Sequence, residues 1–361
     1  MDNESNNLEK IGFDKWLLER VPAESLEQFE IARVVAVHKD SYTISNGEVE
    51  VLSELIGKIL FSANSPVEYP AVGDWVLANF YDNNTFAIIH KILPRKSLLK
   101  RKTPGKKVDF QLIAANIDVA FIVQSLNENF NLRRLERYLV MANESQIQPI
   151  VLLSKSDLLD NEVITGITED INKIMPNLRV IPFSNKNDSC LDNVKGIMQA
   201  GLTYCLLGSS GVGKTTLINN LLGEEKYITK TVSKKESKGK HATTHRQLIK
   251  LDSGALVVDT PGMRELGNLS VASGLEETFS DIFELSEKCR FRNCKHVNEK
   301  GCAVLNAVED GQLSAKRYQN YIKMTKESTF NEMSYFEKKK KNKQFGKFVK
   351  TVMKHKKSRG Y

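Results

Sequence analysis

Residues 208–215 place the strongest constraint on how this chain folds. Their sequence, GSSGVGKT, matches the phosphate-binding pattern G-x-x-x-x-G-K-[ST]. The apolar segment YCLL precedes the loop, and the helical pattern TLINNLL follows it. Glycines in such a loop let backbone N–H groups surround phosphates, and the positive end of the helix adds to the attraction. The sequence therefore predicts a nucleoside triphosphate site on a strand–loop–helix unit.

Further residues around this loop fit magnesium-dependent phosphate chemistry. Lys214 is expected to reach the β- and γ-phosphates, and the Thr215 hydroxyl to coordinate Mg²⁺. Asp259 ends the apolar run ALVVD and begins the sequence DTPG, so its carboxylate can bind Mg²⁺ through water and Gly262 can offer its N–H to the γ-phosphate. The polar segment 235–248 lies between these motifs, as a mobile switch loop would. In that segment, Thr243 or Thr244 is the candidate for a second Mg²⁺ ligand.

The water that attacks the γ-phosphate needs a side chain to orient it, and the residue after Gly262 cannot do so. Met263 follows Gly262, where many GTPases carry a glutamine, and a thioether cannot orient water. His241, in the switch segment, is the nearest candidate. The alternative reading is an exposed histidine in a loop.

A guanine-reading motif is expected at residues 154–157, SKSD, directly after the apolar run PIVLL. The Asp157 carboxylate can accept hydrogen bonds from two donors on guanine that adenine lacks, and the Lys155 stem can lie over the base. Ser154 stands where asparagine or threonine is usual, so a weaker tie to the phosphate loop is expected. Ser184 and Asn185 follow the run LRVIPF and are candidates for the loop that contacts the guanine oxygen.

The order of these motifs is informative. Guanine-reading motifs normally follow the phosphate loop, but here residues 154–157 and Ser184 precede residue 208. The sequence therefore predicts a circularly permuted GTPase domain. As a consequence, the segment after Gly262 leads directly into the C-terminal region, so that nucleotide state can act on that region.

A compact cluster, Cys289-x4-Cys294-x-His296-x5-Cys302, lies in the C-terminal region. Three thiolates and one imidazole complete a tetrahedral Zn²⁺ site without leaving a position for water. One structural zinc ion per chain is therefore expected. Cys190 and Cys205 stand apart from this cluster and are assigned no role.

Charge is distributed unevenly along the chain. Residues 338–361 contain ten lysines, one arginine and no acidic residue, so they carry +11, whereas the whole chain carries +8 and the remainder therefore −3. Such a basic tail is expected to be disordered and attracted to nucleic acid, with a solubilising terminus as the alternative. No apolar run reaches the length of about 20 residues that a membrane span needs, and the polar start MDNESNNLEK is unlike a secretory signal. A cytoplasmic protein without membrane partners is expected.

Alternating strand and helix patterns indicate several domains. A short helical lead (1–29) precedes about five short strands with a turn at Asn46-Gly47, which suggests an OB-fold barrel (30–95). A basic linker (96–109) leads to an α/β P-loop domain (110–272) with a parallel sheet covered on both faces. A zinc-binding helical domain (273–330) and the tail (331–361) complete the expected layout.

These motifs together resemble the RsgA family, the GTPases that depend on the small ribosomal subunit. The resemblance spans about residues 30–325, and it implies the same three-domain fold, Mg²⁺ and zinc as cofactors, and catalysis by His241. It also implies that the protein binds the small (30S) subunit and its rRNA, assists late subunit maturation, and hydrolyses GTP faster on the subunit; we expect a monomer. The sequence departs from the family pattern at HATT (241–244), at Ser154 and at Asn293, none of which removes a group assigned to chemistry. The motifs that carry the resemblance are LPRKS (93–97), SKSD ahead of the phosphate loop, GSSGVGKTTLIN (208–219), GKHATTHR (239–246), DTPGMRE (259–265), the Cys/His spacing and RYQNY (317–321).

Two other readings remain open at this point. The chain could be a nucleic-acid-binding module whose nucleotide site only gates RNA affinity, or it could be an ATPase, which Asp157 disfavours. The residues expected to contact GTP or GDP are Ser154, Lys155, Ser156, Asp157, Ser184, Asn185, Gly208, Ser209, Ser210, Gly211, Val212, Gly213, Lys214, Thr215 and Thr216.

Overall fold

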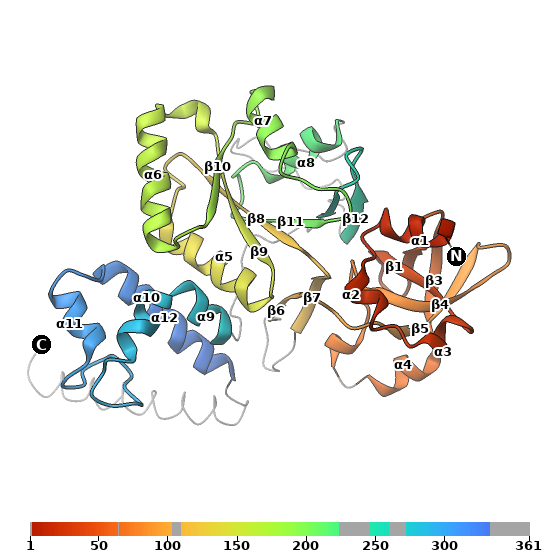
Figure 1. Ribbon diagram of the computed structural model, residues 1–361, viewed down its shortest axis with the longest axis horizontal. Helices are drawn as coiled ribbons and strands as arrows, with labels where there is room; N and C mark the ends of the chain where they lie inside the picture. Colours follow the sequence, from red (N-terminus) through yellow and green to blue (C-terminus); the bar gives the residue numbers. More distant parts are fainter. Residues whose placement is uncertain (1, 64, 103–109, 224–245, 260–271, 333–361) are drawn as a thin grey trace, which may run out of the picture.

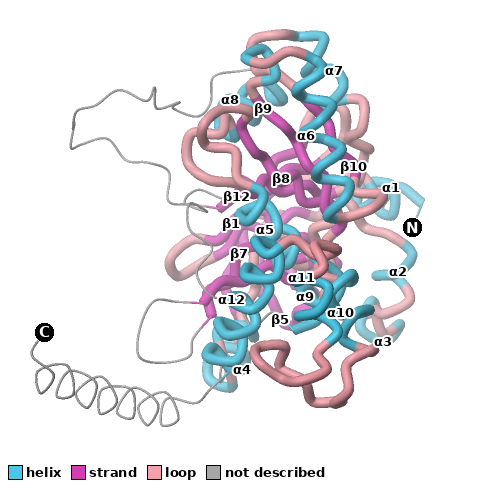
Figure 2. Tube along the Cα trace, turned by 90° about the vertical axis from the view of Figure 1, so that its left-hand side faces the viewer, coloured by secondary structure: helices cyan, strands magenta, loops and turns pink. Residues whose placement is uncertain are grey.

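A computed structural model describes residues 2–63, 65–102, 110–223, 246–259 and 272–332. It contains a five-stranded barrel, a central α/β domain and a group of C-terminal helices (Figure 1). In the view turned by 90°, the strands run through the interior and helices surround them (Figure 2). No helix in these described ranges is long and apolar enough to cross a membrane.

The N-terminal barrel closes as the alternating strand pattern predicts. Its strands are hydrogen-bonded in the order β1-β2-β3-β5-β4, and β4 pairs again with β1. Strand β3 alternates exposed and buried residues, so one of its faces lines the barrel core. The barrel elements are β1 (Glu30–Val37), β2 (Tyr42–Ser45), β3 (Glu50–Leu55), α4 (Gly57–Ser62), η1 (Pro66–Glu68), β4 (Trp75–Tyr81) and β5 (Phe86–Ile92).

The N-terminal lead belongs to the folding unit of the barrel. It forms α1 (Asp2–Glu9), α2 (Lys15–Leu18) and α3 (Ala23–Leu26). Phe13 and Leu17 are buried against the barrel, and the Phe13 ring meets the Trp75 ring edge-on at 5.0 Å between centroids. The apolar positions of the lead therefore complete the core on the outside of β1 and β4.

The central domain has the parallel sheet that the continuous apolar runs predict. The strand order is β10-β9-β8-β11-β13-β12, and β12 is antiparallel to β13. Helices α5 and α6 pack on one face and α7 and α8 on the other. The strands are β8 (Val119–Ser125), β9 (Gln148–Ser154), β10 (Arg179–Pro182), β11 (Thr203–Leu207), β12 (Arg246–Lys250) and β13 (Leu256–Asp259). The helices are α5 (Leu132–Glu144), η2 (Ser156–Leu158), α6 (Asn161–Ile174), α7 (Asp188–Lys195) and α8 (Lys214–Leu222).

Backbone pairing joins the barrel to this sheet. Strand β1 of the barrel pairs with β12, with Ala36 opposite Gln247 and Val37 opposite Arg246. The buried Arg33 side chain, also on β1, donates to the Thr203 hydroxyl at the start of β11 over 2.8 Å. The segment expected to be a basic linker contains strand β6 (Leu98–Lys102), which pairs with β7 (Phe110–Ala115).

The C-terminal helices form their own core around Phe279 and Tyr321. They lie next to α5 of the central domain (Figure 1), and Gly274 of α9 packs so closely on α5 that a Cβ there would lie 2.2 Å from the Val140 carbonyl oxygen. A side chain larger than hydrogen would therefore separate the two helices. The helices are α9 (Ala272–Thr278), α10 (Ser280–Ser286), α11 (Ala303–Glu309) and α12 (Ala315–Glu332).

Candidate functional site

The phosphate loop has the backbone that its glycines permit. Gly208 and Gly213 have φ values of +152° and +93°, and a Cβ on Gly208 would lie 2.5 Å from the Val123 carbonyl oxygen. Residues with side chains are strained at such φ values, so the loop requires glycine at both positions. Lys214 begins α8, and its ammonium donates to the carbonyl oxygens of Gly208 at 2.7 Å and Ser209 at 2.8 Å. The lysine therefore lies over the loop that is expected to hold phosphates.

The segment SKSD follows β9 and contacts the phosphate loop. The buried Ser154 hydroxyl donates to the Val212 carbonyl oxygen over 2.6 Å, so a serine at this position does connect the two motifs. Lys155 is in the left-handed region at φ +61°, which turns the chain sharply after the strand.

Asp157 is held as a carboxylate by two neighbours. The Ser184 hydroxyl donates to its Oδ1 over 2.7 Å, and Lys186 Nζ lies 3.3 Å from its Oδ2. The Ser184 hydrogen bond is the main reason why the pKa of Asp157 is lowered from its usual value, and Lys186 adds to the effect. Asp157 is therefore ionised at neutral pH, which is the form that accepts hydrogen bonds from two guanine donors.

The three motifs meet at one edge of the sheet. The phosphate loop follows β11, SKSD follows β9, and Ser184-Asn185 follows β10, all of which are parallel strands. Ligands of open α/β sheets bind at the carboxyl ends of the strands. The structure therefore brings together the residues expected to read the base and those expected to hold phosphates, although the base motifs come first in the chain.

The structure describes two of the residues expected to bind magnesium. Thr215 is exposed at the start of α8, and the Asp259 backbone ends β13 next to β11. His241, Thr243, Thr244 and Gly262 lie outside the described residues.

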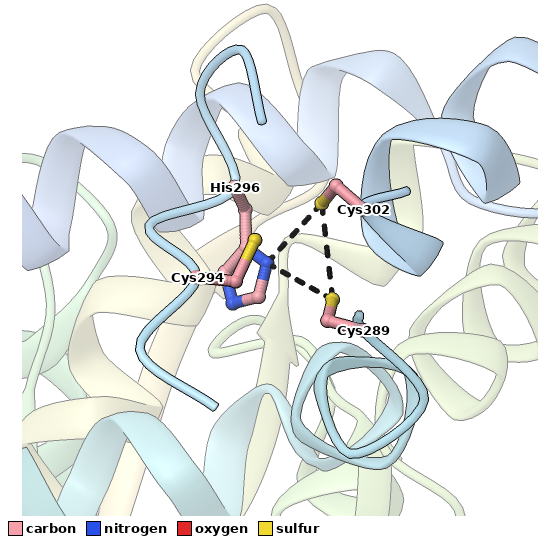
Figure 3. A group of neighbouring side chains, drawn as sticks. All are labelled: Cys289, Cys294, His296 and Cys302. Carbon is pink, nitrogen blue, oxygen red and sulfur yellow. Dashed lines mark hydrogen bonds between the residues drawn. The ribbon is translucent and has the colours of Figure 1, made fainter. Parts of the chain in front are cut away.

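The Cys/His cluster forms a compact set of ligand atoms (Figure 3). The four candidate ligand atoms of Cys289, Cys294, His296 and Cys302 lie within 4.8 Å of one another. Bond lengths of about 2.3 Å to sulfur and about 2.0 Å to nitrogen in a tetrahedron separate two sulfurs by about 3.8 Å, and sulfur from nitrogen by about 3.5 Å. The observed separations are 3.9 Å between the Cys289 and Cys302 sulfurs, and 3.6 and 3.4 Å from these sulfurs to His296 Nδ1. The donor set and its spacing therefore fit a zinc ion.

Comparisons with known proteins agree with this geometry. A model of the RsgA GTPase family matches residues 92–269, and an ABC transporter model matches residues 191–357, which include the same phosphate loop. The chain is 36% identical over 355 residues to the "Small ribosomal subunit biogenesis GTPase RsgA 2" of Vibrio parahaemolyticus, with 98% of this chain and 95% of the relative covered. The chain belongs to the RsgA GTPase family. It is accordingly a GTP-hydrolysing enzyme.

Two solved structures share the fold of this RsgA-family chain. YjeQ from Thermotoga maritima superposes with a TM-score of 0.62 at 27% identity, over 83% of this chain and 98% of that one. YloQ, described as a circularly permuted GTPase, superposes with a TM-score of 0.61 at 24% identity, over 87% of this chain and all of the other. The permuted order that the motif sequence predicted is therefore confirmed as a property of the fold.

Two asparagines that contact the candidate nucleotide-site residues were not predicted from the sequence. Asn129, in the turn after β8, donates from Nδ2 to the Ser209 hydroxyl over 3.3 Å. Asn220, on α8, donates to Asn185. Neither belongs to a recognisable motif, because each is brought to the site by tertiary packing. No sequence pattern would have identified them.

The Cys/His cluster also contacts neighbouring elements of the C-terminal helices. Cys302 is the N-cap of α11, where its sulfur accepts from the Leu305 N–H at 3.4 Å, and the Tyr318 hydroxyl donates to the His296 carbonyl oxygen over 2.6 Å. Burial raises the pKa of the Cys302 thiol to about 11. A metal ion would therefore have to displace a proton from this thiol, and would supply in return the charge that holds the sulfurs together.

Cys294→Ser is expected to lower the zinc content from about one ion per chain to well below that, and to destabilise helices α10–α12. The intrinsic rate of GTP hydrolysis should largely survive, because the nucleotide residues lie in the central domain. Metal analysis together with thermal unfolding measures both effects, and Cys190→Ser, outside the cluster, is the matched control. Wild-type protein that is free of metal and yet fully stable would contradict a structural zinc site.

A buried charge network connects the C-terminal helices to the central domain. The fully buried Glu136 carboxylate of α5 accepts from Arg317 of α12 over 2.9 Å and also pairs with Arg133. The same Arg317 donates to Asp281 of α10 at 2.7 and 2.8 Å. Removing one member of such a buried pair leaves an uncompensated charge and costs about 3–5 kcal/mol. The network therefore fixes the C-terminal helices against α5, the helix that follows the Asn129 turn.

Proposed function

We propose that this protein is a GTPase that binds the small (30S) ribosomal subunit and assists its late maturation. It hydrolyses GTP to GDP and phosphate, and the subunit stimulates the reaction. The observation that carries the proposal is the match along nearly the whole chain to a relative named for small-subunit biogenesis. This role implies that the protein works in the cytoplasm on rRNA, and we further propose that it acts as a monomer.

The proposed mechanism assigns one task to each part of the site. Asp157 selects guanine, the backbone N–H groups of residues 208–215 surround the phosphates, and Lys214 turns from the loop carbonyls to the β- and γ-phosphates. A magnesium ion, when bound, neutralises charge that develops on the phosphates, and Thr215, Asp259 and one switch threonine would hold it. His241 orients the attacking water, and Gly262 contacts the γ-phosphate.

The sheet offers a physical route for stimulation by the subunit. Residues 246–248, the end of the expected switch segment, lie in strand β12, which pairs with β1 of the barrel. The Arg246 guanidinium also donates to the Leu112 carbonyl oxygen of β7. A partner that fixes the barrel therefore also fixes the strand that contains the end of the switch segment, which supports turnover that depends on the subunit.

Deleting residues 338–361 removes a charge of +11 and leaves an acidic body. Affinity for ribosomal subunits is expected to fall, and its dependence on salt to flatten, because fewer counterions are released on binding. Intrinsic GTPase activity should not change. Binding measured across a salt series tests this, and a slope equal to that of the full chain would show that the tail only keeps the protein soluble.

Co-sedimentation with purified small and large subunits tests the proposed partner. We expect the protein to pellet with small subunits in the presence of a non-hydrolysable GTP analogue, less with GDP, and not with large subunits. Equal binding to both subunits, or binding independent of nucleotide, would favour the alternative of a general nucleic-acid-binding module. Competition of ATP with GTP for the site would favour an ATPase.

A further inference from the structure

The loop that follows β10 is attached to the phosphate loop by a side chain. Asn185, directly after Ser184, donates from Nδ2 to the Gly213 carbonyl oxygen over 3.2 Å. A Cβ on Gly213 would lie 2.7 Å from that same nitrogen. The contact therefore requires glycine at residue 213. The backbone φ of +93° at this residue requires glycine as well.

A second asparagine holds the first one in place. Asn220 lies on α8, whose first turn carries Lys214 and Thr215. Its Nδ2 donates to both the backbone oxygen of Asn185 at 3.2 Å and the side-chain oxygen of the same residue at 3.3 Å. The amide of Asn185 is thereby oriented with its nitrogen toward Gly213. The helix that begins the phosphate site and the loop that adjoins the base site are thus linked through one residue.

We propose that Asn185 and Asn220 are positioning residues that fix the base-reading half of the site relative to the phosphate-binding half. The inference rests on the proposed assignment of residues 208–215 to phosphates and of Asp157 to guanine. Ser184, which holds Asp157, is the residue before Asn185, so the position of the Asp157 carboxylate follows that of this loop. The Ser154 hydroxyl fixes the other side of the base site through Val212.

The physical effect of this bridge is preorganisation. A nucleotide contacts both halves at once, so its affinity depends on the distance between them. The affinity of a ligand that contacts only one half does not depend on that distance. Ordering a loop on binding consumes part of the binding free energy. Because Asn185 and Asn220 already order the loop, binding does not have to supply that ordering free energy. Only ligands that carry both a base and phosphates benefit, since only they contact both halves of the site.

Asn220→Ala removes both hydrogen bonds to Asn185. The affinity for GDP is expected to fall about tenfold, as for the loss of one to two ordinary hydrogen bonds. The affinity for pyrophosphate, which contacts only the phosphate half, should change by less than about twofold. Titration calorimetry with GDP and pyrophosphate as separate probes measures the difference.

Two further variants show whether a loss of GDP affinity comes from the bridge and not from reduced stability of the protein. Asn185→Ala removes the same bridge from a half-buried loop position, and because both residues act in one chain of hydrogen bonds, the double variant should lose about as much GDP affinity as either single variant. Asn193→Ala, at an exposed position on α7, is the matched control and should bind GDP like the wild type.

The inference is overturned if both bridge variants bind GDP as tightly as the wild type. It is also overturned if pyrophosphate and GDP weaken by the same factor, since the phosphate loop itself would then be damaged. Failure of the site assignment would look different, because Asp157→Asn would then leave GDP affinity unchanged as well.

Discussion

Asp157→Asn is expected to weaken GTP binding by about 2–5 kcal/mol, the effect of truncating one side of a charged hydrogen-bonded pair that the bound base covers. In the proposed site the carboxylate accepts from two guanine donors, and an amide in its place offers a donor where an acceptor is needed. Affinity for xanthosine triphosphate should rise, because its additional carbonyl can accept from the new amide. Equilibrium binding of GTP and of xanthosine triphosphate measures this change in base preference.

The structure strengthens this expectation and provides a control. Because the hydrogen bond from Ser184 lowers the pKa of Asp157, the carboxylate stays charged as the pH falls from neutrality, and guanine binding is lost only when the pH falls through this lowered pKa. Asp170→Asn, on the exposed surface of α6, changes the same functional group away from the site and should bind GTP normally. Unchanged GTP affinity in Asp157→Asn would show that SKSD does not read guanine.

His241→Ala is expected to reduce subunit-stimulated turnover by about 100-fold or more, a typical contribution of a residue that orients or deprotonates the attacking water. GTP affinity and subunit binding should remain nearly intact, because in the proposed mechanism the imidazole contacts the water and not the nucleotide. Phosphoryl transfer depends mainly on positioning and charge stabilisation, so the loss of one positioning group lowers kcat.

Lys214→Ala is the companion variant for this measurement. The ammonium of Lys214 lies over the phosphate loop, so its removal should lower nucleotide affinity as well as turnover. Single-turnover rates with saturating subunits separate the two variants. A wild-type stimulated rate in His241→Ala would mean that another group, such as rRNA, positions the water.

The sequence predicted those parts of the fold that depend on local pattern. Continuous apolar runs identified β8, β9, β10, β11 and β13 of the parallel sheet, because strands buried on both faces carry few polar residues. The closed barrel followed from the alternating strands near the N-terminus. The Cys/His spacing identified all four members of the candidate zinc site, since their separation along the chain is short.

Other features depend on contacts between distant segments and were not predictable. Strand β12 lies at the end of a polar segment, and β6 lies inside a run of basic residues, so neither has a strand-like pattern of its own. Glu136 and Arg317 are typical surface residues by type, yet they are buried together because α5 packs against α12. The Asn185–Asn220 bridge likewise joins residues 35 positions apart.

The most direct test of the account is GTP turnover by the full chain, measured alone and with purified small ribosomal subunits, with large subunits as the control. We predict slow turnover alone, a large stimulation by small subunits and none by large subunits. Turnover that is the same with and without small subunits would contradict the proposed function, even if the protein binds GTP as its site indicates.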